Sequence, residues 1–181
     1  LEGVAEGDLA LQQRVRVRTA GDDAGRADVD VRPEEAVHLR TVVERKGVKL
    51  LVDALNEVDP ARLQGLELEF LGKTTSSWPP TRVLGLLSDE ARRALADVSF
   101  LTDLDQPQAL AHLKRPGTLA VIPSLHDNSP NTIYECIEEG IPFIASRAGG
   151  APELIAPEDA GDVLFEPTAE ALAGLLGRLL T

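Results

Sequence analysis

The sequence predicts an α/β protein with a doubly wound parallel sheet that carries helices on both faces. Short apolar runs alternate with segments whose apolar residues have helical spacing. Strands that are separated by helices are joined by crossovers, which favours a parallel sheet covered on both sides. The length of 181 residues, with 43% hydrophobic and 27% charged residues, suits one globular domain with a sizeable core.

The expected strands are short apolar runs bounded by glycine, proline or polar residues. They cover residues 36–40, 66–71, 98–101, 119–123, 141–145 and 162–165. We expect the second strand to close at Gly72-Lys73. The Pro79-Pro80 pair then indicates a loop, with Trp78 as its apolar anchor.

The expected helices carry end signals as well as apolar faces. Ser88 followed by two acids is an N-cap signature, Pro107 suits a first turn, and Gly140 suits a helix end. A double glycine precedes a short helix that begins near Ala151. The longer helical segments cover residues 48–55, 88–96, 107–114, the stretch before Gly140, and 169–180.

Residues 1–34 have a different character from the rest of the chain. The stretch Arg14-Val15-Arg16-Val17-Arg18 alternates with period two, and a turn-rich cluster follows it. We interpret this region as an edge strand, a linker or a remnant of a preceding region, and residues 35–181 as the main domain. The chain starts at Leu1 and contains no methionine, so we expect a fragment of a longer protein.

Charge and cysteine content exclude several classes of function. The net charge of -12 argues against general affinity for nucleic acid or anionic membranes. A single cysteine, Cys136, excludes an internal disulfide and fits a reducing compartment, so we expect a cytoplasmic protein. No apolar run approaches the roughly 20 residues of a membrane span. The scattered histidines do not have metal-ligand spacing.

The most informative stretch places two carboxylates around the start of a helix. Asp127 follows the strand at 119–123, and Glu135 lies in the helix that ends at Gly140. A helix N-terminus at the carboxyl edge of a parallel sheet attracts anions, and carboxylates accept hydrogen bonds from hydroxyl groups. Asp127 could instead cap the helix, and Glu135 could be an exposed helical acid.

The chain resembles the retaining glycosyltransferases of the GT-B fold, group 1, in their carboxyl-terminal half. That half carries two acids separated by seven residues, as in Asp127 to Glu135, and then Gly-x-Pro before an apolar strand, as in Gly140-Ile141-Pro142. The stretch Gly149-Gly150-Ala151-Pro152-Glu153 continues the likeness. The resemblance covers roughly residues 36–180 and implies a Rossmann-like domain that binds a nucleotide sugar.

The resemblance also implies a set of site residues. The catalytic group comprises Asp127 at the donor sugar, Glu135 at the ribose, and Lys46 at the diphosphate. The other donor-binding residues are Arg40, Gly72, Asn128, Ser129, Asn131, Thr132, Gly149 and Gly150, with Asn131 and Thr132 acting through their backbone N–H groups. The double glycine by itself is also compatible with a simple tight turn.

Two departures from the family pattern stand out. The first acid is usually Glu and is Asp127 in this chain. The family's Gly-Arg-Leu stretch does not align without a gap: its arginine position holds Thr41, and a shift of one residue is needed to bring in Arg40.

The implied activity is transfer of a sugar from a nucleoside-diphosphate sugar to an acceptor hydroxyl, with retention of configuration. A hexosyltransferase-like enzyme that needs no metal or other cofactor is expected. The family's amino-terminal, acceptor-binding domain is absent from these residues, so the isolated chain should be inactive. The alternatives are a non-catalytic nucleotide-sugar-binding or interaction module and a nucleotide-sugar epimerase, against which the two-acid motif argues.

Overall fold

The computed structural model describes residues 36–42, 44–127 and 130–180, with only the backbone described for residues 36–42. The edge strand or linker expected in residues 1–34 lies outside these residues. Within the described residues, no helix has the length and hydropathy that a membrane crossing requires.

The centre of the fold is a parallel sheet of six strands in the order β3-β2-β1-β4-β5-β6. This confirms the predicted doubly wound α/β architecture. The chain moves outward in one direction from β1 and then in the other from β4, so the order reverses between these two strands. The strands are β1 (Ala36–Val42), β2 (Glu67–Thr74), β3 (Asp97–Leu101), β4 (Leu119–Ile122), β5 (Phe143–Ser146) and β6 (Leu164–Phe165).

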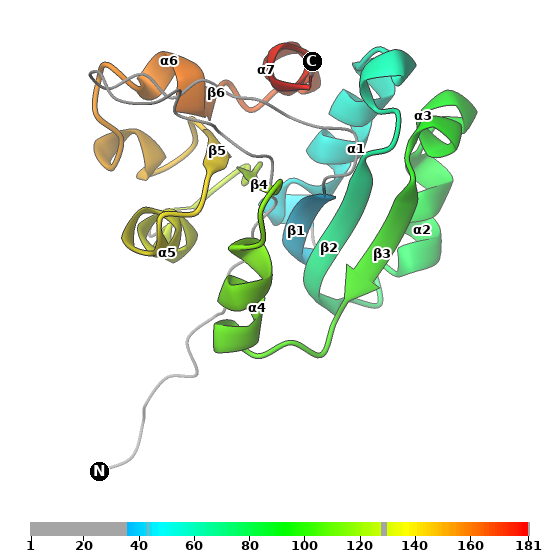
Figure 1. Cartoon of the computed structure of the whole chain (residues 1–181), viewed down its shortest axis with the longest axis horizontal. Helices are drawn as coiled ribbons and strands as arrows, with labels where there is room; N and C mark the ends of the chain where they lie inside the picture. Colours follow the sequence, from blue (N-terminus) through cyan, green and yellow to red (C-terminus); the bar gives the residue numbers. More distant parts are fainter. Residues whose placement is uncertain (1–35, 43, 128–129, 181) are drawn as a thin grey trace.

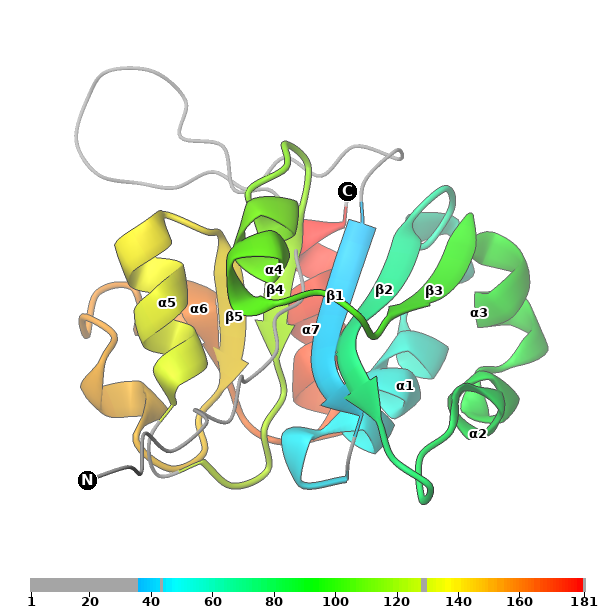
Figure 2. The same cartoon turned by 90° about the horizontal axis from the view of Figure 1, so that it is seen from below.

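Helices cover both faces of the sheet. In Figures 1 and 2, α4 and α5 lie on one face, and α1, α2, α3 and α7 lie on the other. The α-helices are α1 (Val48–Glu57), α2 (Pro80–Leu86), α3 (Asp89–Ala94), α4 (Gln106–Leu113), α5 (Asn131–Glu139), α6 (Ala160–Val163) and α7 (Ala169–Leu179). Short 3₁₀ turns occupy η1 (Glu44–Lys46), η2 (Pro60–Arg62) and η3 (Ala151–Glu153).

The core forms where the apolar helix faces meet the sheet. All four residues of β4 are buried, as expected for a central parallel strand. The side chains of Leu51 and Leu55 on α1 and of Leu172 and Leu176 on α7 have no solvent exposure. Their helical spacing places them on one face of each helix. The two helices therefore pack on the core through these apolar faces.

Helix α2 was not predicted, because the Pro79-Pro80 pair was interpreted only as a loop. Pro79 is the N-cap residue of this helix and Pro80 its first residue, a position where the missing N–H group costs nothing. Val83 is fully buried and holds the helix on the core. Trp78, 3% exposed, does anchor the preceding loop, and the Arg82 guanidinium lies 4.0 Å from the centroid of its ring.

Several expected strand boundaries were wrong. Strand β1 continues to Val42 rather than ending at residue 40, and β5 begins at Phe143 rather than at residue 141. Strand β2 does not close at Gly72-Lys73 but continues to Thr74, because Gly72 adopts φ 116° and absorbs a shift in the pairing with β1. The last strand holds only Leu164 and Phe165, since Asp162 and Val163 form the end of α6. A short apolar run does not distinguish a strand from the last turn of a helix.

Candidate functional site

The loops that follow β1 and β4 meet at the point where the strand order reverses. The backbone N–H of Leu125 donates to the carbonyl of Arg45 at 2.9 Å. Gly47 has φ 80°, and a Cβ atom there would lie 1.8 Å from the carbonyl oxygen of Pro123. Only glycine permits this approach. In Figure 2 the arrowheads of β1 and β5 point to this edge of the sheet, which in open α/β sheets is where ligands bind.

Lys46 and Asp127 are brought together by this contact. The Nζ atom of Lys46 lies 2.7 Å from Oδ2 of Asp127, and the two side chains are 12% and 14% exposed. A largely buried cation therefore lies beside a largely buried carboxylate at the edge of the sheet. The alternative in which Asp127 is the N-cap residue of the following helix is wrong, because the N-cap residue of α5 is Pro130.

The double glycine after β5 packs against Asp127. The N–H of Gly150 donates to the carbonyl of Asp127 at 3.1 Å. Gly149 has φ 61°, and a Cβ atom on it would lie 1.9 Å from the same carbonyl oxygen. The glycines thus allow a close backbone approach rather than only a tight turn, and they fix the position of Asp127 from the side of β5.

Helix α5 begins beside this pair and carries Glu135. Asn131 is its exposed first residue and Thr132 its buried second residue. Gly140 ends the helix with φ 63°, as predicted. Glu135 is partly exposed, and its Oε1 atom accepts a hydrogen bond of 2.6 Å from Nε2 of Gln106. Cys136, on the same helix, is fully buried in the core. Burial, together with the neighbouring Glu135 carboxylate, raises the pKa of its thiol.

The other predicted donor-binding residues are placed as follows. Arg40 lies near the end of β1, where its backbone pairs with Leu71 of β2; only the backbone of this strand is described. Gly72 lies on β2 opposite the end of β1, at the shift in pairing. Asn128 and Ser129 lie outside the described residues.

Three contacts at this edge were not anticipated from the sequence. Gln106 had no assigned role, and nothing in its spacing connects it with Glu135. Gly47 could have been noticed, because a glycine directly before a helix often marks a close backbone approach. The hydroxyl of Ser146, at the end of β5, donates to the backbone carbonyl of Ser124 and adds a further link between the β4 and β5 ends.

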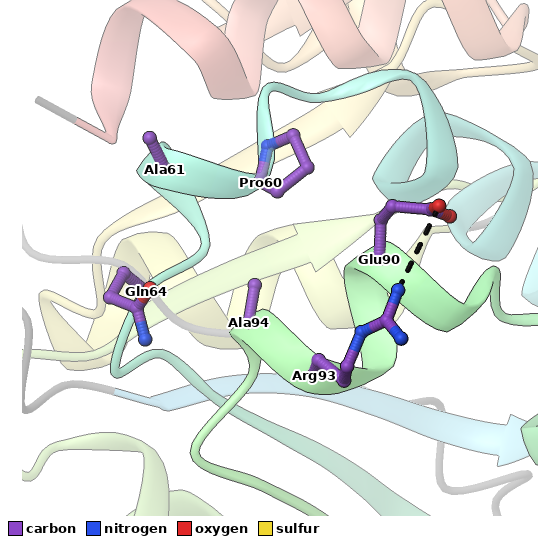
Figure 3. A pocket seen from close by; sticks show the side chains of 6 residues that line it. All are labelled: Pro60, Ala61, Gln64, Glu90, Arg93 and Ala94. Atoms are coloured by element: carbon purple, nitrogen blue, oxygen red, sulfur yellow. Dashed lines mark ion pairs between the residues drawn. The ribbon is translucent and has the colours of Figure 1, made fainter.

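A separate pocket lies at the opposite edge of the sheet. It has a volume of about 280 Å³ and lies between η2 and α3, which precede β2 and β3 (Figure 3). The one ion pair in its lining, Arg93 to Glu90 at 3.8 Å, is mostly exposed. Because it is remote from the carboxyl edge, it does not belong to the predicted site.

Potential metal ligands are not clustered in the described part of the chain. No three His, Cys, Asp or Glu side chains are placed there to hold an ion. Among the charged groups at the carboxyl edge, the predicted site residues are Lys46, Asp127 and Glu135.

Comparison with known proteins places this arrangement in a family. Residues 35–181 match the family described as glycosyl transferases group 1. The chain is 29% identical over 139 residues to the MMP α-(1→4)-mannosyltransferase of Mycolicibacterium hassiacum, covering 76% of this chain and 32% of that protein.

Two solved structures share the fold at 25% identity. One is the sucrose-phosphate synthase of Thermosynechococcus elongatus, with a TM-score of 0.63 over 83% of this chain and 37% of that one. The other is HepE of Anabaena in complex with UDP and glucose, with a TM-score of 0.56 over 77% of this chain and 36% of that one. The chain spans about a third of the length of each of these relatives. It belongs to the group 1 glycosyltransferases of the GT-B fold and corresponds to their carboxyl-terminal domain.

Proposed function

We propose that this domain binds the nucleoside-diphosphate sugar of a retaining, hexosyltransferase-like enzyme. The observation that carries the proposal is the meeting of Lys46 with Asp127 at the reversal of strand order, beside the start of α5. A cation and a helix N-terminus favour a diphosphate, and carboxylates accept hydrogen bonds from the hydroxyls of a sugar. The UDP and glucose held by the Anabaena relative support a ligand of this class.

In this proposal each group has a distinct role. Lys46 and the backbone N–H groups of Asn131 and Thr132 contact the diphosphate, with Arg40 as a second cation. Asp127, with Asn128 and Ser129, contacts the donor sugar. Glu135 accepts from the ribose. Gly72, Gly149 and Gly150 allow the backbone to approach the donor.

The chemical contribution of the domain is electrostatic. As the bond between the sugar and the diphosphate breaks, negative charge grows on the departing diphosphate. The Lys46 cation and the positive end of α5 stabilise that charge, with the largest effect where water is excluded. This stabilisation uses side chains and backbone dipoles of the chain and requires no metal ion.

The whole enzyme, as we propose it, transfers the sugar to an acceptor hydroxyl held by an amino-terminal domain, and acts in the cytoplasm. The 181-residue chain then binds donor weakly and turns over little. The proposal that the sugar keeps its anomeric configuration rests on the resemblance of the Asp127 to Glu135 motif to that of the retaining glycosyltransferases. It is tested by the anomeric configuration of the product that the longer protein forms, measured by NMR.

Calorimetric titration of the chain with UDP, GDP, ADP and dTDP tests donor binding. We expect one nucleotide to bind and Glu135→Ala to weaken it by about 1–3 kcal/mol, the usual cost of removing one partner of a hydrogen bond. Glu138→Ala is the matched control, because Glu138 is exposed on the same helix. Failure of all four nucleotides to bind the wild-type chain would contradict the proposal. Binding without transfer by the longer protein would favour a non-catalytic module.

A further inference from the structure

Gln106 makes a side-chain contact that ties Glu135 to a different helix. Gln106 is the first residue of α4 and Glu135 lies on α5, and 29 positions separate them in the sequence. The distance of 2.6 Å between Nε2 and Oε1 is short for an N–H···O bond, as expected when the acceptor is a carboxylate. In this contact the amide nitrogen of Gln106 donates and the carboxyl oxygen of Glu135 accepts.

The amino end of α4 is held in a defined geometry. The Asp105 carboxylate accepts from the N–H of Gln108 at 2.9 Å, and the Gln108 side chain accepts from the N–H of Asp105 at 2.9 Å. This reciprocal pair is a complete capping box. Gln106 therefore projects from a helix end whose backbone is fixed on both sides of it.

The other end of α4 is anchored to the sheet and to α5. Glu69 on β2 is 9% exposed, and its Oε2 atom lies 2.8 Å from Nε2 of His112 and 2.9 Å from Nη2 of Arg115. Lys114 forms an ion pair with Glu139 at the end of α5. Helix α4 is thus held by contacts at both of its ends, and its first side chain reaches Glu135.

We propose that Gln106 is a positioning residue that holds one oxygen of Glu135 so that the other accepts hydrogen bonds from the ribose hydroxyls. The inference rests on the proposed donor-binding function and adds to it a residue that sets the preference for ribose. A glutamate side chain that is partly exposed loses rotational freedom when it binds a ligand. The hydrogen bond from Gln106 removes part of that freedom before the ligand arrives.

The test uses two ligands and an isosteric pair of side chains. The 181-residue chain labelled with ¹⁵N is titrated to millimolar concentrations with the nucleoside diphosphate that binds best and with its 2′,3′-dideoxy counterpart. Gln106→Glu keeps the shape of the side chain but replaces the donor with an acceptor, and Gln106→Lys restores a donor. The amide spectra also report whether each variant is folded.

We expect Gln106→Glu to weaken binding of the ribonucleotide about three- to tenfold, in the range of one lost hydrogen bond. Binding of the dideoxy nucleotide should change by less than about twofold, since it lacks the hydroxyls that Glu135 contacts. Gln106→Lys should bind the ribonucleotide as the wild type does. In a Glu135→Ala background, Gln106→Glu should have no further effect, because the two residues then no longer interact.

Equal weakening of both nucleotides would overturn the inference, because it would show a structural role for Gln106. A loss with Glu135→Ala but none with Gln106→Glu would overturn the inference and leave the proposed function in place. If no ribonucleoside diphosphate binds the wild-type chain, the proposed function fails and the inference fails with it.

Discussion

Lys46 and Asp127, separated by 81 positions in the sequence, form an ion pair with 2.7 Å between Nζ and Oδ2 at the carboxyl edge of the sheet. Both side chains are largely buried. Under the proposed function Lys46 is also a ligand of the donor diphosphate, so the carboxylate of Asp127 and the phosphate oxygens compete for one cation. This competition gives the first prediction.

Asp127→Asn should tighten binding of UDP, or of whichever diphosphate binds, by about three- to tenfold. The change removes a negative charge beside the phosphate site and frees the Lys46 cation. The same variant should not tighten binding of the nucleotide sugar, because it also alters the contact with the sugar hydroxyls. Calorimetry with both ligands measures the difference, and added salt should reduce it.

Lys46→Met is the counterpart of that variant and should weaken binding of both the nucleoside diphosphate and the nucleotide sugar. If Asp127→Asn weakened binding of the nucleoside diphosphate as strongly as Lys46→Met does, Asp127 would support the phosphate site rather than compete with the phosphate for Lys46.

Gly149→Ala should lower the free energy of unfolding by about 1–3 kcal/mol. Its φ of 61° and the approach of a Cβ atom to 1.9 Å from the Asp127 carbonyl require the loop to move. Gly174→Ala is the control: Gly174 lies in α7, nothing lies within 4 Å of an added Cβ, and alanine should stabilise the helix by about 0.5–1 kcal/mol. Urea denaturation measures both. Equal stability of the two variants would show that the loop after β5 does not constrain Asp127.

Glu69→Ala should cost about 2–3 kcal/mol of unfolding free energy, and Arg115→Ala less than about 1 kcal/mol. Glu69→Ala removes a buried side chain together with its contacts to both His112 and Arg115. Arg115→Ala removes only one of these contacts, made by a side chain that is 48% exposed, and leaves Glu69 in contact with His112. Glu67→Ala, on the same strand and less buried, provides the control in thermal or urea unfolding. A larger loss for Arg115→Ala than for Glu69→Ala would be inconsistent with Glu69 as the centre of this cluster.

Cys136 should be inert toward a disulfide reagent in the folded chain and should react once urea unfolds it. Burial, with a contribution from Glu135, raises the pKa of the thiol in the folded state, and the thiolate is the reactive form. As the pH rises past the pKa of the unfolded thiol, only the unfolded chain ionises, so stability should fall in that range. Cys136→Ala should lack this component of the pH dependence. Rapid labelling of the folded protein at mildly alkaline pH would contradict the burial of the thiol.

The sequence alone predicted most of the elements that build the sheet. The helices α1, α5 and α7 were found from apolar periodicity. The helices α3 and α4 were found from the start signals at Ser88 and Pro107, and the end of α5 from Gly140. The errors fell where local signals are ambiguous. A proline pair can open a helix as well as a loop, as at Pro79-Pro80, and a short apolar run such as 162–165 can be part helix and part strand.

By itself the sequence determined the alternation of strands and helices and the two-acid motif, because both are encoded by neighbours along the chain. Only the tertiary structure decided that Asp127 pairs with Lys46, that Gly149 lies against Asp127, and that Gln106 reaches Glu135. These contacts join segments that follow different strands of the sheet and are far apart in the sequence. They form only because of the strand order of the sheet. That order is set by the crossover connections and is not predicted by any local sequence pattern.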